Sequence, residues 1–418
     1  MTSVASTDDL PSAPPVRRTT FSSLRTRNYR IFVMAQLVSN TGAWVQRIAQ
    51  DWLVLSITGS TTAVGVTTAL QFLPTLLFGI FGGRLADRYP KHRILQFTQA
   101  GMCLLATTLA VLTLTGTVRA WHVYVVAFVG GLLIAADNPT RQAFVTELVG
   151  PAQLRNAIGL NSSAFQLGAL VGPAISGVLI NAVGPGWSFA ANALSYVAPL
   201  VGLALLRERD LIRRPPTTRV SGGVSVLRYV RERPRMLWTM VLIGVFAVFT
   251  NNLPVTLAAY AKFVFHSGAG GYGLLSSVLA VGSLVGALVS ARRSRTTLRG
   301  MVVVGAAVSG LALLAAAMPG EDAFTAVLAG LGAMTLMLVT SANATVQMAS
   351  DDGIRGRVMG LYLLIFTGSG TFGGPLLGAI DQHLGARTGL LLAGAVPGLA
   401  TALVAMRLGS DKRGVCPS

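Results

Sequence analysis

The sequence predicts an all-α membrane protein, and three observations lead to this fold class. Hydrophobic residues make up 52% of the 418 positions and charged residues only 11%, where a soluble domain has about 25% charged residues. Apolar stretches long enough to cross ~30 Å of hydrocarbon recur along the chain. Basic residues gather in every second connection between these stretches. A water-soluble surface cannot be built from this inventory.

We count twelve apolar stretches and assign each one to a transmembrane helix of about 20 residues or more. They form two sets of six, at 29–57, 61–86, 94–116, 121–145, 155–181 and 187–206, then at 236–260, 270–291, 299–318, 322–347, 354–382 and 386–407. The predicted organisation is a disordered cytoplasmic tail (1–28), an N-terminal six-helix bundle (29–206), a basic cytoplasmic linker (207–235), a C-terminal six-helix bundle (236–407) and a second cytoplasmic tail (408–418).

The positive charges predict the orientation of the chain in the membrane. A net charge of +18 would suggest a nucleic-acid partner in a polar protein. Here the basic residues lie in alternate loops, such as 84–93, 141–155 and 207–235, and the intervening loops carry few. The positive-inside rule then places both termini in the cytoplasm of a multi-pass protein of the cell (inner, or plasma) membrane. We expect no nucleic-acid partner.

Nothing in the sequence predicts an enzyme, a metal site or a bound cofactor. The two cysteines, Cys103 and Cys416, are far apart, the four histidines are scattered, and no nucleophile or phosphate-loop motif is found. We expect the lipid bilayer and a small-molecule substrate as partners, a monomeric state, and an ion gradient, most simply of protons, as the driving force. A receptor or scaffold would have the same composition.

An internal repeat relates the two halves. The segment Leu154–Leu160 runs on to Gly172-Pro173, and Arg357–Leu361 runs on to Gly374-Pro375 half a chain length later. Six helices per half keep the halves parallel, which predicts a pseudo-two-fold axis along the membrane normal. This symmetry is typical of transporters whose substrate site lies between two rocking bundles.

The connection from Gly83 to Leu95 resembles motif A of the major facilitator superfamily, with Pro90 where Gly is usual and His92 where Lys or Arg is usual. The resemblance implies a cytoplasmic latch in which Asp87 meets the start of helix 11, with Lys91 and Asp137 taking part. A plain positive-inside anchor is the alternative reading of the basic cluster. The predicted cytoplasmic gate comprises Gly83, Asp87, Arg88, Lys91, Arg93, Asp137 and Arg141.

Helix 5 resembles motif C, which is characteristic of exporters in the superfamily, through Gly168, Gly172, Pro173 and Gly177, with Ser176 in place of one Gly. Glycines four apart also let helices pack closely, so a simple packing face remains an alternative. The stretches Asp51–Val54 and Asp137–Phe144 look like the branch that contains bacterial macrolide-efflux and enterobactin-export proteins.

Helix 1 carries a polar stripe. At ~100° per residue, Gln36, Asn40, Trp44, Arg47 and Asp51 share one face, with Gln50 beside them. Ionisable groups are costly inside a membrane and line cavities. We predict that Asp51 exchanges protons and that Arg47, four residues away, pairs with it; a static structural pair is the alternative. Further cavity candidates, each of which could instead join helices, are Asn161, Gln166, Asn251, Asn252, Asn343, Tyr362 and Phe366.

These observations predict a secondary active exporter of small amphipathic molecules, such as a drug, a siderophore or a secondary metabolite. It would work by alternating access and exchange protons for its substrate. The alternatives left open are a facilitator-type importer of a small solute and a non-transporting membrane receptor or scaffold.

Overall fold

The structure is a computed structural model that describes residues 22–212, 225–292, 297–351 and 354–410. Within these ranges the regular structure is entirely helical, and eleven helical segments are long and apolar enough to cross a membrane. The all-α membrane fold is therefore confirmed. The helices of the first half are α1 Arg27–Thr58, α2 Thr61–Arg88, α3 Lys91–Leu114, α4 Ala120–Val183, α5 Pro185–Ser195 and α6 Val197–Ala204.

The helices of the second half begin with a short segment in the linker. They are α7 Val226–Arg231, α8 Pro234–Thr250, α9 Leu253–Ala259, α10 Gly268–Arg292, α11 Leu298–Ala317, α12 Glu321–Met348, α13 Arg355–Leu384 and α14 Ala386–Ser410. Short 3-10 turns cover Ser22–Arg25 and Glu208–Asp210, and a π-helical turn over Tyr260–Val264 continues α9.

Helix α1 is a predicted membrane span, but it is not apolar enough to be identified as one by its hydropathy. It has 32 residues, more than the ~20 needed to cross a bilayer, yet it is not among the eleven apolar segments. The polar stripe explains this, because Asn40, Arg47 and Asp51 lower the hydropathy of every window that contains them.

Three segments differ in detail from the sequence-based expectation. The predicted loop between helices 4 and 5 is largely helical, so α4 runs through it with one break at Gly150, whose φ of 66° lies in the left-handed region that favours glycine. Helix 6 is interrupted at Tyr196, between α5 and α6. Helix 7 is interrupted at Asn251 and Asn252, just before Pro254, which has no backbone N–H to continue the helix.

Residues 22–28 form regular structure, a 3-10 turn followed by the start of α1, which corrects the prediction that they belong to a disordered tail. The hydroxyl of Ser23 donates to Oδ1 of Asn156 at 2.6 Å, and its amide donates to the same oxygen at 3.1 Å. These bonds fasten the start of the chain to α4. The rest of the predicted tail, residues 1–21, and residues 411–418 of the second tail lie outside the described residues.

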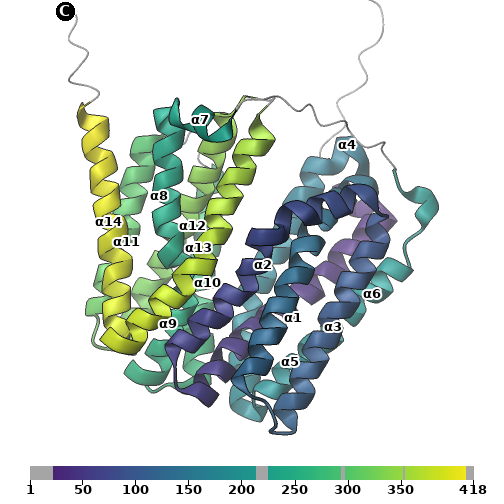
Figure 1. Ribbon diagram of the computed structural model, residues 1–418, viewed down its shortest axis with the longest axis horizontal. Coiled ribbons are helices and arrows are strands. Elements are labelled where there is room, and N and C mark those ends of the chain that lie inside the picture. Colours follow the sequence, from purple (N-terminus) through teal and green to yellow (C-terminus); the bar gives the residue numbers. More distant parts are fainter. Residues whose placement is uncertain (1–21, 213–224, 293–296, 352–353, 411–418) are drawn as a thin grey trace, which may run out of the picture.

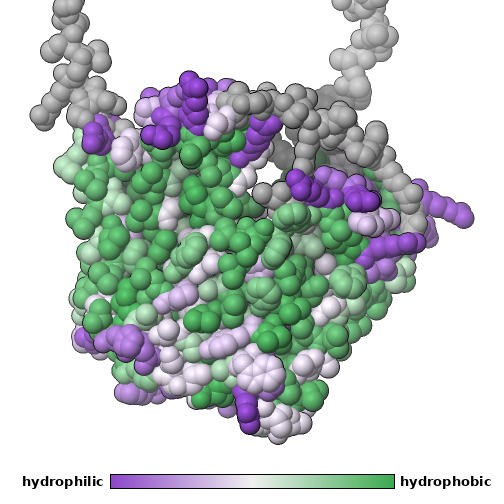
Figure 2. Space-filling view, viewed as in Figure 1, coloured by the Kyte–Doolittle hydropathy of each residue, from purple (hydrophilic) through white to green (hydrophobic). Residues whose placement is uncertain are grey.

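The helices of each half pack mainly against one another, and Figure 1 shows the two groups side by side. Within the first half α4 packs on α1 and α2, while in the second half α10 packs on α12 and α11 packs on α14. Figure 2 shows an apolar band across the middle of the face in view, with hydrophilic residues at both ends. This distribution is that of a protein whose middle lies in lipid.

Glycines bring the two halves together near one end. A Cβ on Gly273 of α10 would lie 2.6 Å from the Cα of Gly177 of α4, and a Cβ on Gly374 of α13 would lie 2.7 Å from the carbonyl oxygen of Gly65 of α2. We call these two contacts the glycine seam. At the other end, where α7 lies, the groups diverge and the surface is hollowed between them (Figures 1 and 2).

Candidate functional site

A cavity of about 350 Å³ opens inside the first half of the chain, among α1 to α5. This volume is at the lower end of the range for small-molecule sites, ~300–1,000 Å³. Its wall combines amide, charged and aromatic side chains, which suits a ligand with polar and apolar parts. The lining residues include Asn40, Trp44, Gln46, Arg47, Gln50, Gln71, Phe72, Gln99, Asp137, Asn138, Arg141, Phe165, Asn192 and Tyr196.

Helix α1 supplies the largest share of this wall because its polar residues recur at helical spacing. Asn40, Trp44 and Arg47 lie three or four residues apart, so they project to one side of the helix. Gln50 continues the row by three more residues. The predicted polar stripe therefore faces the cavity at these four positions.

Arg47 does not pair with Asp51 in this structure, which corrects the pairing predicted from their spacing. No ion pair of Arg47 is found within the described ranges. Its guanidinium carbon instead lies 5.4 Å from the ring centroids of both Trp44 and Phe72. Two aromatic faces are thus in cation–π range of the arginine.

Asp51 lies outside the cavity, at the contact between the two halves. Its side chain is 2% exposed, and its Oδ2 accepts a hydrogen bond from the hydroxyl of Tyr272, on α10, at 3.1 Å. The other carboxylate oxygen, Oδ1, has no hydrogen-bond partner among the described residues. Trp52 stacks on Tyr272 with ring centroids 6.3 Å apart. The polar stripe therefore leaves the cavity before it reaches Asp51.

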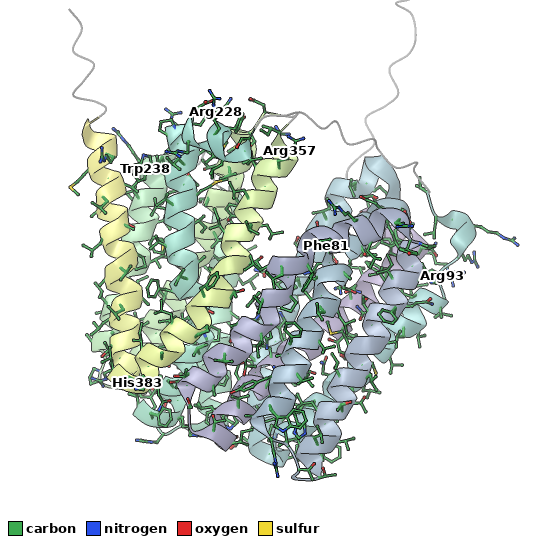
Figure 3. The ribbon with its side chains drawn as sticks, viewed as in Figure 1. Phe81, Arg93, Arg228, Trp238, Arg357 and His383 are labelled. Atoms are coloured by element: carbon green, nitrogen blue, oxygen red, sulfur yellow. The ribbon has the colours of Figure 1, made fainter. Side chains whose placement is uncertain are left out.

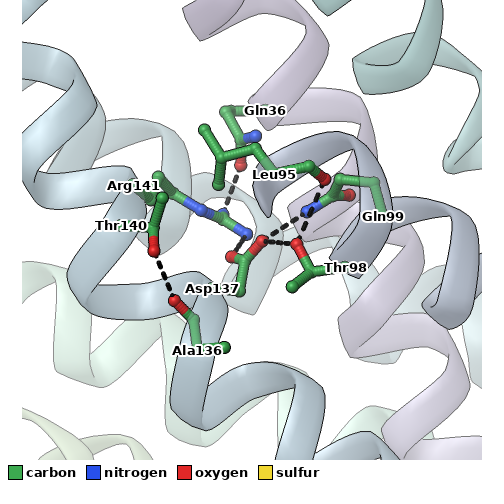
Figure 4. A network of polar contacts seen from close by, with 8 residues as sticks. All are labelled: Gln36, Leu95, Thr98, Gln99, Ala136, Asp137, Thr140 and Arg141. Atoms are coloured by element: carbon green, nitrogen blue, oxygen red, sulfur yellow. Dashed lines mark hydrogen bonds and ion pairs between the residues drawn. The ribbon is translucent and has the colours of Figure 1, made fainter. Parts of the chain in front are cut away.

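Asp137 is the centre of a buried polar network that joins three helices (Figure 4). Its carboxylate forms an ion pair with Arg141, one turn further along α4, and accepts hydrogen bonds from Thr98 at 2.7 Å and Gln99 at 3.0 Å, both on α3. Arg141 also donates to the side-chain carbonyl of Gln36 on α1. Gln36 thus lies behind the cavity wall, where it holds Arg141.

The remaining predicted gate residues surround the connection between α2 and α3. Lys91 forms an ion pair with Glu147 of α4 at 2.7 Å, so Lys91 and Asp137 belong to separate polar groups within the first half. Figure 3 shows Phe81 of α2 in the first half and Arg357 of α13 in the second half, at the end where the two groups of helices diverge.

Around this connection, Asp87, Arg88 and Arg93 are exposed. Gly82 packs directly against the backbone of α4 at Ala135, where a side chain would not fit. Gly83 has open space around it, because a Cβ there would meet no atom within 4 Å. The latch itself stays a prediction.

The helix-5 motif packs the second part of α4 against α1 and α10. A Cβ on Gly168 would lie 3.0 Å from the backbone of Asn40, and one on Gly172 would collide with Trp44. Ser176, at the position where the motif usually has Gly, donates to the carbonyl of Val45 at 2.9 Å. Gly177 meets Gly273 across the seam. The motif therefore positions the cavity side of α1 and joins the two halves.

Two of the predicted cavity residues of the second half, Asn251 and Asn252, join helices in this structure. Asn251 donates to Ser369 Oγ at 3.1 Å, and fully buried Asn252 donates to the carbonyl of Ser369 at 3.1 Å, which ties α8 to α13. Tyr362 and Phe366 stack with centroids 6.5 Å apart. Asn343 accepts from Gln347 at 2.8 Å. These residues do not line the cavity, and neither do the half-buried Asn161 and Gln166 of α4.

Sequence reasoning missed a second buried carboxylate, Asp381 near the end of α13. It is 6% exposed, and its Oδ2 accepts from Thr256 of α9 at 2.8 Å, while Oδ1 has no hydrogen-bond partner in the described part of the chain. The signal that could have revealed it is a lone acidic residue inside a predicted span, the criterion that singled out Asp51.

The sequence profile of a family described as transmembrane secretion effector matches residues 18–412. The multidrug efflux pump Tap of Mycolicibacterium fortuitum is 25% identical over 376 residues, which are 84% of this chain and 90% of that protein. The staphyloferrin A transporter of Staphylococcus aureus is 25% identical over 62% of this chain and 66% of its own length. The enterobactin exporter EntS of Citrobacter koseri is 23% identical over 67% of each chain.

Solved structures with the same fold are transporters. A bacterial homologue of the lysosomal transporter Spinster, inward-facing and unoccupied, aligns with a TM-score of 0.73 at 14% identity over 92% of this chain and 96% of its own. A bacterial homologue of the iron transporter ferroportin, also inward-facing, aligns with a TM-score of 0.66 at 16% identity over 90% and 99%. The chain is thus a multi-pass membrane transporter and no enzyme, and it belongs to the transmembrane secretion effector family of the major facilitator superfamily.

Proposed function

We propose that this protein is a secondary active exporter of small amphipathic molecules that works by alternating access and proton antiport. In this proposal α1 is a true membrane span, so that twelve spans form two six-helix bundles related by a pseudo-two-fold axis, with both termini in the cytoplasm. The observation that carries the proposal is the cavity of about 350 Å³, where amide and charged groups alternate with aromatic rings.

The glycine seam supports alternating access. Two pairs of helices, α4 with α10 and α2 with α13, approach through glycines near one end of the molecule, and the hollow at the other end adjoins the basic linker that carries α7. The positive-inside rule assigns that basic end to the cytoplasm, so this conformation would be inward-facing. Transport then requires the seam to open and the basic end to close.

Asp51 supports proton coupling. A buried ionised carboxylate needs partners for both oxygens, and among the described residues only one oxygen of Asp51 has a hydrogen-bond partner. That partner, Tyr272, belongs to the other half, so opening the seam would separate the two and admit water. The charge of Arg47 also acts on Asp51 from one helical turn away. Asp51 would bind a proton when the seam opens and carry it inward.

Export of amphipathic compounds is favoured by what the relatives are named for. Tap is a multidrug efflux pump and EntS an enterobactin exporter, and they match 84% and 67% of this chain. The helix-5 residues Gly168, Gly172 and Pro173 add the exporter motif.

The experiment that tests this proposal is accumulation of fluorescent dyes and macrolides in cells that express wild type, Asp51→Asn or Asp322→Asn. Asp322 is an exposed carboxylate at the start of α12 and serves as the matched control. We expect wild type and Asp322→Asn to lower the accumulation of at least one of these compounds about tenfold, and a protonophore or Asp51→Asn to abolish the effect. Higher accumulation in expressing cells would mean import, and equal activity of Asp51→Asn would remove the proposed proton site.

A further inference from the structure

We propose that Arg47 and Gln50 form a binding site for an anionic group, such as a carboxylate, on an aromatic or otherwise apolar ligand. This inference rests on the proposed function, because it assigns the substrate class of the same cavity. It predicts that acidic amphiphiles are preferred as substrates over lipophilic cations.

The charges of the cavity wall do not cancel. Three charged residues line it, and two of them, Asp137 and Arg141, form an ion pair with each other. Asp51 is the nearest carboxylate on α1, but it lies outside the cavity wall and accepts its hydrogen bond from Tyr272. Arg47 therefore gives the cavity one positive charge with no ion-pair partner in the described ranges.

The aromatic contacts leave the hydrogen-bonding edge of Arg47 available. Rings at 5.4 Å on Trp44 and Phe72 attract the guanidinium through their faces. Its N–H groups point outward in the guanidinium plane, and no hydrogen bond of theirs is found among the residues that the structure describes. A planar fork of donors matches the two oxygens of a carboxylate.

Gln50 independently indicates that the cavity binds a hydrogen-bond acceptor. It lines the same cavity, is 3% exposed, and its Nε2 has no hydrogen-bond partner among the described side chains and backbone. Residues three apart on a helix are neighbours, so Gln50 and Arg47 extend from one side of α1 into the same cavity. Burying such a donor without an acceptor costs free energy. One anionic group could satisfy both residues.

The rest of the wall indicates what the anion is attached to. Trp44 and Phe165 meet edge to face with centroids 5.9 Å apart, and Phe72 faces Arg47 from α2. These rings offer an apolar surface beside the positive charge. A cationic ligand would meet Arg47 in a low-dielectric site, where like charges repel strongly. The geometry therefore selects a compact aromatic acid.

Two probes of one shape test the charge directly. 1-Naphthoate and 1-naphthamide differ in charge and hardly in size, and their binding to purified protein in lipid nanodiscs can be measured by calorimetry without any ion gradient. We expect the wild type to bind the carboxylate about tenfold more tightly than the amide. Arg47→Gln should remove this preference by weakening carboxylate binding, with amide binding nearly unchanged.

Two further variants separate charge from folding. Arg47→Lys keeps the charge and should retain part of the preference, because an ammonium attracts the anion without the planar fork. Arg84→Gln removes an exposed arginine that lies 5.6 Å from the ring of Phe81, outside the cavity, and should bind both probes as the wild type does. All variants must elute as single species in size-exclusion chromatography.

The outcomes are distinguishable from those of the export assay. Equal binding of the two probes by the wild type, no binding of either, or an unchanged preference in Arg47→Gln would each overturn the anion site. None of these results depends on dye export. Failure of dye export alongside selective naphthoate binding would instead overturn efflux and leave the binding site in place.

Discussion

At the residue scale, the interior holds its charges in two ways. Asp137 has three side-chain partners: Thr98 and Gln99 on α3, and Arg141 on its own helix. Arg141 extends the network to Gln36. Asp51 and Asp381 each have a single hydroxyl partner and one oxygen without any among the described residues. A fully bonded carboxylate stays ionised at little cost, whereas a half-bonded one is suited to bind a proton.

We expect Asp137→Asn to destabilise the protein, because it leaves the positive charge of Arg141 buried without its ion-pair partner. Breaking a buried pair from one side costs about 3 kcal/mol, which should lower the midpoint of thermal unfolding in detergent by several degrees. The matched control is Glu232→Gln, which removes an exposed pair with Arg228 and should change stability by less than ~1 kcal/mol. Equal midpoints for the two variants would refute a structural role for the network.

At the scale of elements, glycine decides how helices meet. Gly177 and Gly273 let α4 and α10 touch backbone to backbone, and Gly65 and Gly374 do the same for α2 and α13. Small residues at such contacts are typical of helix packing in lipid, where no hydrophobic force drives helices together. The same contacts hold the two halves together in this conformation, and in the proposed mechanism they would have to open during transport.

We expect Gly273→Ala to hinder closure of the seam. Its Cβ would lie 2.6 Å from Gly177 Cα and 2.9 Å from the carbonyl of Pro173, and neither backbone atom can rotate away. The amide of Thr61 on α2 donates to Oε1 of Gln382 on α13 at 2.8 Å, so cysteines at these two positions can form a disulfide when the seam is closed. The yield of this disulfide should fall several-fold when Gly273→Ala is added.

The control for the seam is Gly310→Ala on α11, where a Cβ would meet nothing within 4 Å. It should leave trapping at the level of the cysteine pair alone. Unchanged trapping in Gly273→Ala would mean that the seam is not required for closure.

At the scale of the whole molecule, an apolar band separates two hydrophilic ends (Figure 2). Arg228 and Arg357 lie at the end that carries α7, and His383 lies at the opposite end (Figure 3). Which end faces the cytoplasm is a prediction from the distribution of basic residues.

Labelling single cysteines in intact cells tests this orientation. In a background without Cys103 and Cys416, we expect a membrane-impermeant thiol reagent to label His383→Cys from outside and to reach Arg228→Cys only after lysis. Both positions lie in the described part of the chain, at opposite ends of the molecule. The reverse pattern would invert the predicted topology and would turn the observed conformation into an outward-facing one.

The sequence by itself determined the membrane class, the family and the polar face of α1, because hydropathy, charge in loops and helical spacing are local properties of the chain. Eleven of the predicted spans correspond to helices that are long and apolar enough to cross a membrane. The polar stripe of α1 predicted that Asn40, Trp44, Arg47 and Gln50 face a cavity, and these four residues line the one described above. It could not determine partners from other helices, so it paired Arg47 with Asp51 and grouped Asp137 with Lys91.

Only the tertiary structure decided those partners. Arg47 lies between Trp44 and a ring from α2, and Asp51 binds a tyrosine from the other half of the chain. The cavity also includes residues such as Gln99 and Asn192, which no pattern singles out because polar residues are unremarkable until packing surrounds them. Spacing tells which residues share a face of one helix, but the register and approach of neighbouring helices decide what that face meets.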